Sequence, residues 1–190
     1  MDINALIKNL HKQNVDVGWW DNNPSLVEKL HLCVTEICEA TEGERKDLMD
    51  DHLTHKKMGE VELADALIRL MDLAGRMDVI YKQSTPEQLS GIRYTLEEQY
   101  EDHGICAVHL RLVRNLTDIT NDLTPYVSPY FKSDNFSYVI DSIIVAAEVL
   151  GYHPRGSYGI LDTVLEKNSY NAKRLDHKRE NRSKEGGKKF

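Results

Sequence analysis

Two short carboxylate pairs, Glu36-x-x-Glu39 and Glu62-x-x-Asp65, are the part of the sequence best suited to chemistry. Residues three apart lie on neighbouring turns of one helix face, so two such helices packed side by side would bring four carboxylates together. Four uncompensated carboxylates repel one another, and a hard cation such as Mg²⁺, which prefers oxygen ligands, converts that repulsion into binding. The spacing therefore predicts a divalent-metal site held by all four acids.

A basic motif near the C-terminus, Lys167-x-x-x-Asn171-x-x-Arg174, has residue types that bind phosphate. On one helix, these spacings place an ammonium, an amide and a guanidinium on a single face. The ammonium supplies a point charge, the guanidinium a bidentate fork and the amide an adaptable donor, which together suit a polyphosphate chain. The pattern is common on solvated helices, but beside a metal cluster it indicates that cation and basic residues share the charge of one triphosphate.

Two helices must position the carboxylates. Asn23-Pro24 supplies an N-cap and a first-turn proline, so we expect the helix that carries the first pair to open there. Apolar residues at helical spacing predict the helix that carries the second pair over about 59–77. Sustained strand alternation is absent from the sequence, which predicts an all-α fold, a helical bundle. Further helices are expected over about 3–13 with Asp2 as its cap, from Pro86 onward, and over about 104–123, 135–150 and 158–180.

Length and composition indicate one globular domain. The chain has 190 residues, of which 41% are apolar and 29% are charged, and this is enough for a single sizeable core. We expect one all-α domain over residues 1–182, in which 85–155 is either an insertion or a degenerate repeat. A basic flexible tail is expected over 183–190.

The net charge of −7 is unevenly distributed. The segment 173–190 contains eight Lys or Arg and three acids, a local charge of +5, so the segment 1–172 carries −12. This acidic body argues against duplex nucleic acid as a partner, because phosphate contacts need a broad basic surface. The sequence has no apolar run of membrane-span length, and its start does not predict a signal peptide. Because Cys33, Cys38 and Cys106 form no CxxC pair, we expect reduced thiols in a cytoplasmic protein without membrane contact.

An internal echo relates two stretches of the chain. His31-Leu32-x-x-x-Glu36-x-x-Glu39 has a later counterpart in His109-Leu110-x-x-x-Arg114-x-x-Thr117. Likewise Asp65-Ala66-Leu67-Ile68 is similar to Asp141-Ser142-Ile143-Ile144, at nearly the same offset along the chain. The second copy lacks the paired acids, so it is either a degenerate, scaffolding half or a coincidence between two amphipathic helix pairs.

The order and spacing of the three motifs resemble those of the MazG-like all-α nucleoside triphosphate pyrophosphatase superfamily, which includes the dimeric dUTPases and dCTP pyrophosphatases. The resemblance covers mainly 15–80 and 160–180, and the basic motif lies further from the second acidic pair than in the superfamily. It implies Mg²⁺, with Mn²⁺ as a substitute, bound through the four acids. It also implies hydrolysis of a (deoxy)nucleoside triphosphate to the monophosphate and pyrophosphate. The matching residues are Glu36/Glu39, Glu62/Asp65 and Lys167/Asn171/Arg174.

Hydrolysis of a triphosphate would also give individual residues expected roles. Glu36 or Glu39 would accept the proton of the attacking water. Lys167 and Arg174 would stabilise the charge that builds on the pyrophosphate leaving group. A small helical unit with large apolar faces also predicts a homodimer or a higher homo-oligomer.

Contacts to the base would come from aromatic residues ahead of the first acidic pair. Trp19 or Trp20 would stack on the nucleobase, and His31 would face the same cleft. The alternatives are a tryptophan loop that is anchored on the core and a histidine that is an ordinary helix-surface residue.

Two other interpretations compete with this enzyme. A di-iron carboxylate bundle needs a Glu-x-x-His pair from each of two helices, and Glu28-x-x-His31 supplies only one. The second interpretation is a non-catalytic helical interaction module whose acids are simply solvated. Binding of Mg²⁺ or Mn²⁺ that disappears in Glu62→Ala would separate the enzyme from the module.

Overall fold

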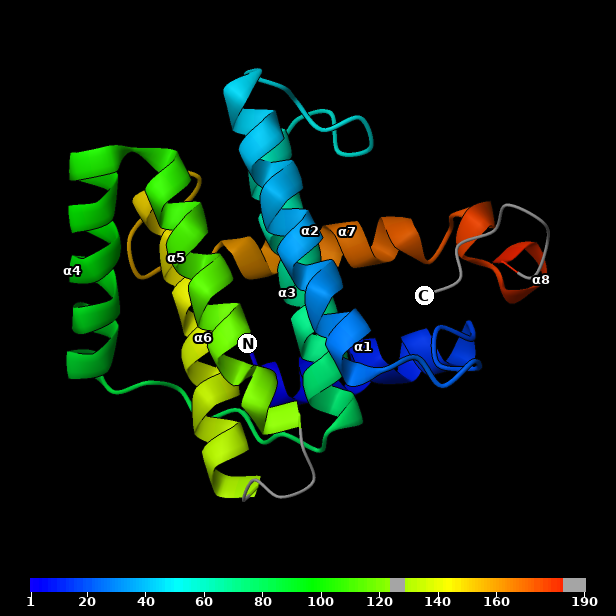
Figure 1. Cartoon of the computed structure of the whole chain (residues 1–190). Helices are drawn as coiled ribbons and strands as arrows, with labels where there is room; N and C mark the ends of the chain where they lie inside the picture. The colour runs from blue at the N-terminus through cyan, green and yellow to red at the C-terminus, as the bar shows by residue number, and fades with distance from the viewer. Residues whose placement is uncertain (124–128, 183–190) are drawn as a thin grey trace.

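All regular structure in residues 1–123 and 129–182, the parts of the chain that this computed structural model describes, is helical (Figure 1). Apart from the helices, these residues contain one isolated bridge, between Met49 and Lys57. The prediction of an all-α fold is therefore confirmed. None of the helices in these residues is long and apolar enough to cross a membrane. The basic tail predicted over 183–190 lies outside the described residues.

The central element is α3 (Met58–Arg76), which packs against four other helices. It runs antiparallel to α2 (Leu26–Arg45), as Figure 1 shows, and also packs against α1 (Ile3–Asp16), α6 (Pro129–Val149) and α7 (Ile160–Asn171). Because neighbours surround it, α3 is buried along most of its length and not only along one stripe. The remaining elements are α4 (Pro86–His103), α5 (Ile105–Asp118), η1 (Ile119–Leu123), η2 (Leu175–His177) and α8 (Arg179–Arg182).

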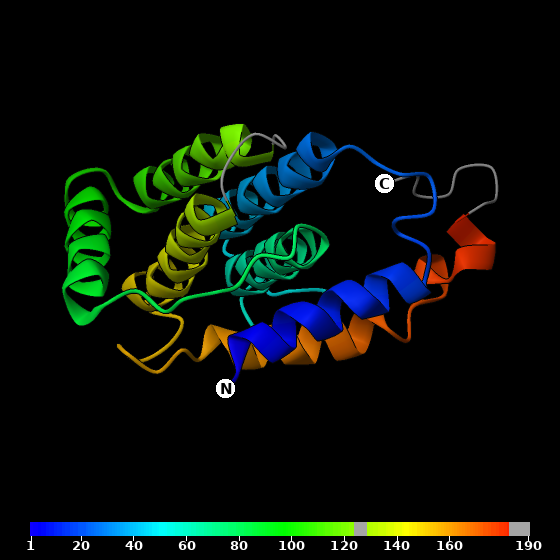
Figure 2. The ribbon, with the colours of Figure 1, turned by 90° about the horizontal axis from the view of Figure 1, so that it is seen from below.

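The segment 85–155, interpreted from the sequence as either an insertion or a degenerate repeat, forms a second layer. Helix α5 packs against α2, α6 packs against α3, and α4 lies outermost against α5 and α6 (Figures 1 and 2). One continuous cluster of buried apolar side chains joins this layer to α2 and α3, and it includes Leu67, Leu112 and Phe136. The described residues thus share a single hydrophobic core.

The start of α2 differs from the prediction. The helix begins at Leu26, with Ser25 as its N-cap, and Asn23 lies outside it with a φ of 46°. A capping box decides the boundary: the Ser25 hydroxyl accepts from the Glu28 backbone N–H at 3.1 Å, and the Glu28 carboxylate accepts from the Ser25 N–H at 2.7 Å. Two otherwise unpaired N–H groups are satisfied there, so the predicted start at Asn23-Pro24 was wrong by two residues.

The helix predicted over 158–180 is also shorter than expected. Helix α7 ends at Asn171, and Arg174 beyond it is extended, with φ −68° and ψ 133°. The stretch Asn168-Ser169-Tyr170-Asn171 contains only modest or poor helix formers, which favours an end at this point. By contrast, α1 with Asp2 as its cap and α4 with Pro86 in its first turn begin where the sequence predicts.

Candidate metal centre

Three of the four predicted metal ligands come together where α2 faces α3. Glu36 projects from α2, and Glu62 and Asp65 project from α3; one oxygen of each lies within 4.8 Å of the other two. We call these three residues the carboxylate cluster. Only 5% of Glu36 and 8% of Glu62 is exposed. Glu39 is exposed about one turn further along α2, outside the cluster but on the wall of the adjoining cavity.

Burial and mutual repulsion disfavour full ionisation of the cluster. Loss of hydration, reinforced by the nearby charges of Asp65 and Glu36, raises the pKa of Glu62 to about 9. Burial also raises the pKa of Glu36, although the Arg69 guanidinium opposes this effect. The cluster therefore retains protons that a bound cation would replace.

Two basic side chains already contact the cluster. The Nε of Arg69 lies 2.5 Å from an oxygen of Glu36. The Nζ of Lys167 lies 3.3 Å from Asp65 and 3.6 Å from Asp50, and only 3% of the Lys167 side chain is exposed. Lys167 is thus held between two carboxylates inside the protein, not displayed on a solvated helix face.

The carboxylate cluster forms part of the wall of a cavity of about 740 Å³, which we call the acidic cavity. Its walls come from the end of α1 and the loop after it, α2, α3, the loop around residues 48–52, α7 and the segment after α7. The predicted site residues on the wall are Trp19, Glu36, Glu39, Glu62, Asp65, Lys167, Asn171 and Arg174.

The acidic cavity has two chemically different ends. Along α2, Lys29 lies seven residues before Glu36, which corresponds to about 10 Å along the helix axis. Along the antiparallel α3, Asp72 lies seven residues after Asp65. The carboxylate cluster therefore lies towards one end of the cavity, and Lys29 and Asp72 lie towards the other. Trp19 belongs to this second end, because the Lys29 ammonium is 5.6 Å from the centre of its ring.

Two predicted base contacts lie elsewhere. Trp20 is not among the lining residues in the described chain; it packs against the core, and its indole N–H donates to Asp72 at 3.0 Å. His11 contacts the same oxygen at 2.7 Å. His31 is exposed on α2 and is also not among the lining residues of the described chain. Only Trp19 of the three predicted base contacts reaches the acidic cavity.

The basic motif reaches the acidic cavity by a different route from the one predicted. Because α7 ends at Asn171, Arg174 does not continue its helical face, so that part of the prediction was wrong. Lys167, Asn171 and Arg174 nevertheless all line the cavity. Among the described residues, no hydrogen-bond partner lies within reach of the buried Oδ1 of Asn171, which leaves one acceptor for a ligand.

Several lining residues were missed by sequence reasoning. Asp72 could have been found, because it extends the spacing of Glu62 and Asp65 along one helix face. Asp50 accepts from the backbone N–H groups of His52 and Leu53 and so fixes the loop that approaches α7. Its contact with Lys167, which lies far along the chain, has no local sequence signal.

The Glu28-x-x-His31 motif of the di-iron interpretation does not form a metal site in this structure. Glu28 completes the capping box at the start of α2, and His31 is exposed. A second group of side chains that could hold a metal ion, Asp50, Asp51 and His52, also lines the acidic cavity. Asp50 in this group already caps its own loop.

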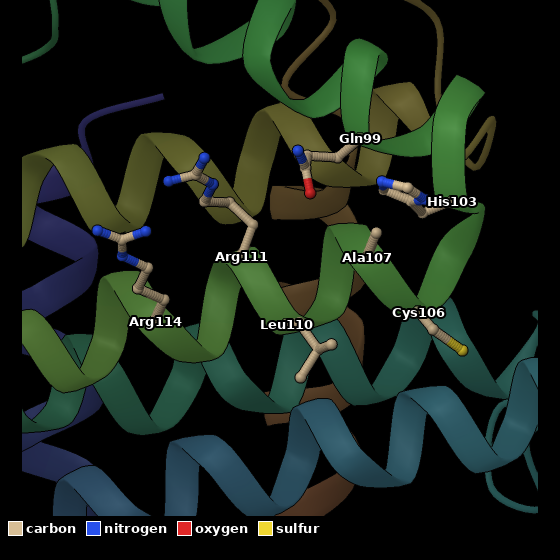
Figure 3. Close-up of a pocket in the computed structure, with 7 residues that line it drawn as sticks. All are labelled: Gln99, His103, Cys106, Ala107, Leu110, Arg111 and Arg114. Atoms are coloured by element: carbon tan, nitrogen blue, oxygen red, sulfur yellow. The ribbon is translucent and has the colours of Figure 1, made fainter.

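A second cavity, of about 560 Å³, lies between α4 and α5 (Figure 3). Gln99 and His103 from α4 face Arg111 and Arg114 from α5, and none of the predicted site residues lines it. It is basic where the first cavity is acidic, so the two cavities suit ligands of opposite charge.

No protein-family model, curated protein or solved structure matches this chain. The likeness to the MazG-like superfamily therefore rests on the sequence motifs. Physically, the acidic cavity offers carboxylate oxygens for a hard cation, basic and amide groups from α7 and the segment after it, and an aromatic ring at the far end.

Proposed function

We propose that this chain is a Mg²⁺-dependent nucleoside triphosphate pyrophosphohydrolase of the MazG-like type, acting in the cytoplasm as a homodimer or higher homo-oligomer. The observation that carries the proposal is the carboxylate cluster: three oxygens within 4.8 Å of one another on the wall of a 740 Å³ cavity. A cavity of this size accommodates a small-molecule substrate such as a nucleotide.

The charge of the acidic cavity supports a divalent cation. Seven Asp or Glu side chains line it against four Lys or Arg, and mutual repulsion contributes to the raised pKa of Glu62. Glu36, Glu62 and Asp65 would hold the ion, joined by Glu39 from the cavity wall, because Mg²⁺ and Mn²⁺ prefer carboxylate oxygens. When bound, Mg²⁺ supplies Lewis-acid polarisation of phosphoryl oxygens and offsets triphosphate charge.

Other side chains of the acidic cavity would accept the proton, bind the leaving group and position the metal ligands. Water attacks the α-phosphorus, the bond from this atom to the bridging oxygen breaks, and pyrophosphate leaves. Glu39 is the better of the two predicted proton acceptors, because Glu36 is ion-paired to Arg69. Arg174, and Asn171 through its amide N–H groups, would bind the leaving phosphates. Lys167, held by Asp65 and Asp50, would position the Asp65 carboxylate.

The decisive experiment is a panel of NTPs and dNTPs incubated with Mg²⁺, with products separated by chromatography. We expect the monophosphate and pyrophosphate in equal amounts, because attack is at the α-phosphorus. Release of inorganic phosphate with a diphosphate would show that a different bond is cleaved and would overturn the proposal.

Calorimetry with Mg²⁺ tests the metal site independently of substrate. We expect binding to the native chain and none to Glu62→Ala, whereas Glu98→Ala, which removes an exposed acid of α4, should bind as the native chain does. Absence of heat at millimolar Mg²⁺ would favour the non-catalytic helical module.

A further inference from the structure

The cavity of about 560 Å³ between α4 and α5, which we call the basic cavity, has a lining opposite in charge to that of the acidic cavity. Its lining residues are Gln99, His103, Cys106, Ala107, Leu110, Arg111 and Arg114. Two of these residues are arginines, one is a histidine and none is Asp or Glu, in a chain where Asp and Glu outnumber Lys and Arg by 31 to 24. The positive lining is therefore a local feature that the overall composition does not explain.

One wall of the basic cavity is a single face of α5. Ala107, Arg111 and Arg114 are spaced i, i+4 and i+7, which places all three on the same side of the helix. The other side of α5 is buried against the core, so this face is fixed in its orientation. The small Ala107 side chain leaves room between α4 and α5, and both guanidinium groups extend beside that space (Figure 3).

The other wall is the last turn of α4. Gly104 alone joins the two helices, and its φ of +73°, which favours glycine, turns the chain sharply between them. The end of α4 therefore lies over the beginning of α5. Gln99 and His103, one helical turn apart, point from α4 towards the face of α5 that carries the arginines (Figure 3).

Both arginines of the basic cavity have unused hydrogen-bonding capacity. The Arg111 side chain is half-buried, and it forms no ion pair or hydrogen bond with another of the described residues. The Arg114 Nε lies 4.0 Å from an oxygen of Asp118, and these two side chains are 70% and 69% exposed, so their attraction is weak. Two guanidinium groups are therefore available to an anion that enters the cavity.

The arrangement of the arginines favours two adjacent phosphate groups. Each guanidinium offers two parallel N–H donors that match one phosphate, and Arg111 and Arg114 are about 4.5 Å apart along the axis of α5. One phosphate group would occupy one guanidinium, whereas a diphosphate can occupy both. A phosphate group carries about −1.5 to −2 charges at pH 7, more than a carboxylate, so this positive lining attracts a diphosphate more strongly than a dicarboxylate. A cavity of about 560 Å³ also accommodates a small ligand of this kind.

We propose that the basic cavity is a second ligand site, which binds a diphosphate group, either as free pyrophosphate or as part of a small molecule. Arg111 and Arg114 each bind one of the two phosphates, and Gln99 and His103 donate N–H groups from the opposite helix. The site uses no residue of the acidic cavity and needs no metal ion, so the proposal does not depend on the proposed function.

Calorimetry on the full chain in metal-free buffer tests this site with pyrophosphate, ADP and inorganic phosphate. Without metal, the carboxylates of the acidic cavity repel these anions. We expect pyrophosphate to bind at least about tenfold more tightly than inorganic phosphate, because only the diphosphate reaches both guanidinium groups. Tighter binding of ADP than of pyrophosphate would identify a carried diphosphate, and the reverse order a free one. Equal affinities for phosphate and pyrophosphate, or no binding at millimolar pyrophosphate, would overturn the proposal.

Three variants locate the site. Arg111→Gln should weaken pyrophosphate binding by about tenfold, and Arg111→Lys, which keeps the charge but loses the paired donors, by about threefold. Arg45→Gln removes the same charge from an exposed residue of α2 that is not among the lining residues of either cavity, and should bind as the native chain does. If Arg45→Gln matches Arg111→Gln, or Arg111→Lys binds like the native chain, the assignment is wrong. Tighter binding of a short single-stranded oligonucleotide than of pyrophosphate would also overturn it, in favour of a nucleic-acid backbone.

Discussion

Helix α3 contains the stretch Asp65-Ala66-Leu67-Ile68, and α6 contains the similar stretch Asp141-Ser142-Ile143-Ile144. Asp65 faces the acidic cavity beside two other carboxylates. Asp141 is fully buried and accepts hydrogen bonds from the Tyr81 hydroxyl at 2.6 Å and the Ser84 backbone N–H at 2.9 Å. The same residue type in similar local sequence is thus part of a candidate site in one helix and fastens the α3–α4 connection in the other.

The partner helices differ in the same way. Glu36 on α2 belongs to the carboxylate cluster, whereas its counterpart Arg114 on α5 is exposed and lies 4.0 Å from Asp118. His31 is exposed, whereas its counterpart His109 is buried and contacts the Thr41 hydroxyl at 2.8 Å. Helices α5 and α6 pack against α2 and α3, so the pair without acids supports the pair that has them.

This comparison contrasts the carboxylates of the candidate site with a carboxylate that is held by hydrogen-bond donors. A single buried carboxylate is stable when O–H and N–H donors satisfy it, as at Asp141. Three close carboxylates, two of them buried, are disfavoured without a ligand, because burial and the charges of Asp65 and Glu36 raise the pKa of Glu62. Whether the second pair of helices descends from a duplication stays a prediction.

The largest effect is expected at Glu62, whose replacement should lower activity, unlike replacement of Asp141. Glu62→Gln should lower pyrophosphohydrolase turnover by more than about 100-fold, because even groups that only support metal ligands are worth 10–100-fold. Glutamine resembles a protonated carboxyl, and the raised pKa of Glu62 means that the metal-free protein already holds that proton near pH 7. The melting temperature in EDTA should therefore stay near that of the native chain. Loss of stability together with activity would mean that Glu62 is structural like Asp141.

Asp141 should show the reverse pattern, in which stability falls and turnover is kept. Asp141→Ala leaves the buried Tyr81 hydroxyl and the half-buried Ser84 N–H without an acceptor, and should destabilise the fold by about 2–4 kcal/mol. Denaturant unfolding measures this loss. Turnover per folded molecule should remain near that of the native chain at low temperature. A stable but inactive Asp141→Ala would contradict the structural assignment.

The third prediction concerns pH. The folded-state pKa of Glu62, about 9, exceeds its ordinary value of 4.5, so the folded protein binds an extra proton between these values. The metal-free protein should therefore lose stability as pH rises through this window. Mg²⁺ should bind more tightly at the higher pH, because it has to displace that proton less often. We expect Mg²⁺ to raise the melting temperature by several degrees more at pH 8.5 than at pH 6. The difference should shrink in Glu62→Gln; an equal shift at both pH values would show that Glu62 is not a ligand.

The smallest effect is expected from restoring an acid to the second helix pair. Arg114→Glu places a carboxylate at the counterpart of Glu36, but this position is exposed and its ion pair with Asp118 is weak. Stability should change by less than about 0.5 kcal/mol, and calorimetry should detect no additional Mg²⁺ site. Appearance of a second site would show that the two halves are closer in structure than their packing indicates.

Local sequence was sufficient for much of the secondary structure but not for its boundaries. Apolar spacing predicted α3 to within one residue at either end, and Thr85-Pro86 marked the start of α4. The start of α2 was misplaced because Ser25 and Glu28 cap each other's backbone, a stronger signal than Asn23-Pro24. The end of α7 was missed because the apolar pattern continues past residues whose helix propensity is low.

Within the candidate site, local spacing placed Glu36, Glu62 and Asp65 on facing helices because residues three apart share a helix face. It could not determine that Glu39 would lie outside the carboxylate cluster or that Trp20 would donate to Asp72. Those outcomes depend on how α1 and α2 pack around α3, which involves contacts between residues far apart in the chain.

The amino-acid sequence by itself determined an all-α protein with two acidic pairs on consecutive helices, because helical periodicity and capping are local properties. Only the tertiary structure decided which acids share a buried site, which cations contact them and which segment faces Trp19. Burial and electrostatics act through space: Lys167 reaches Asp65, and His177 reaches Trp19, although most of the chain lies between the members of each pair.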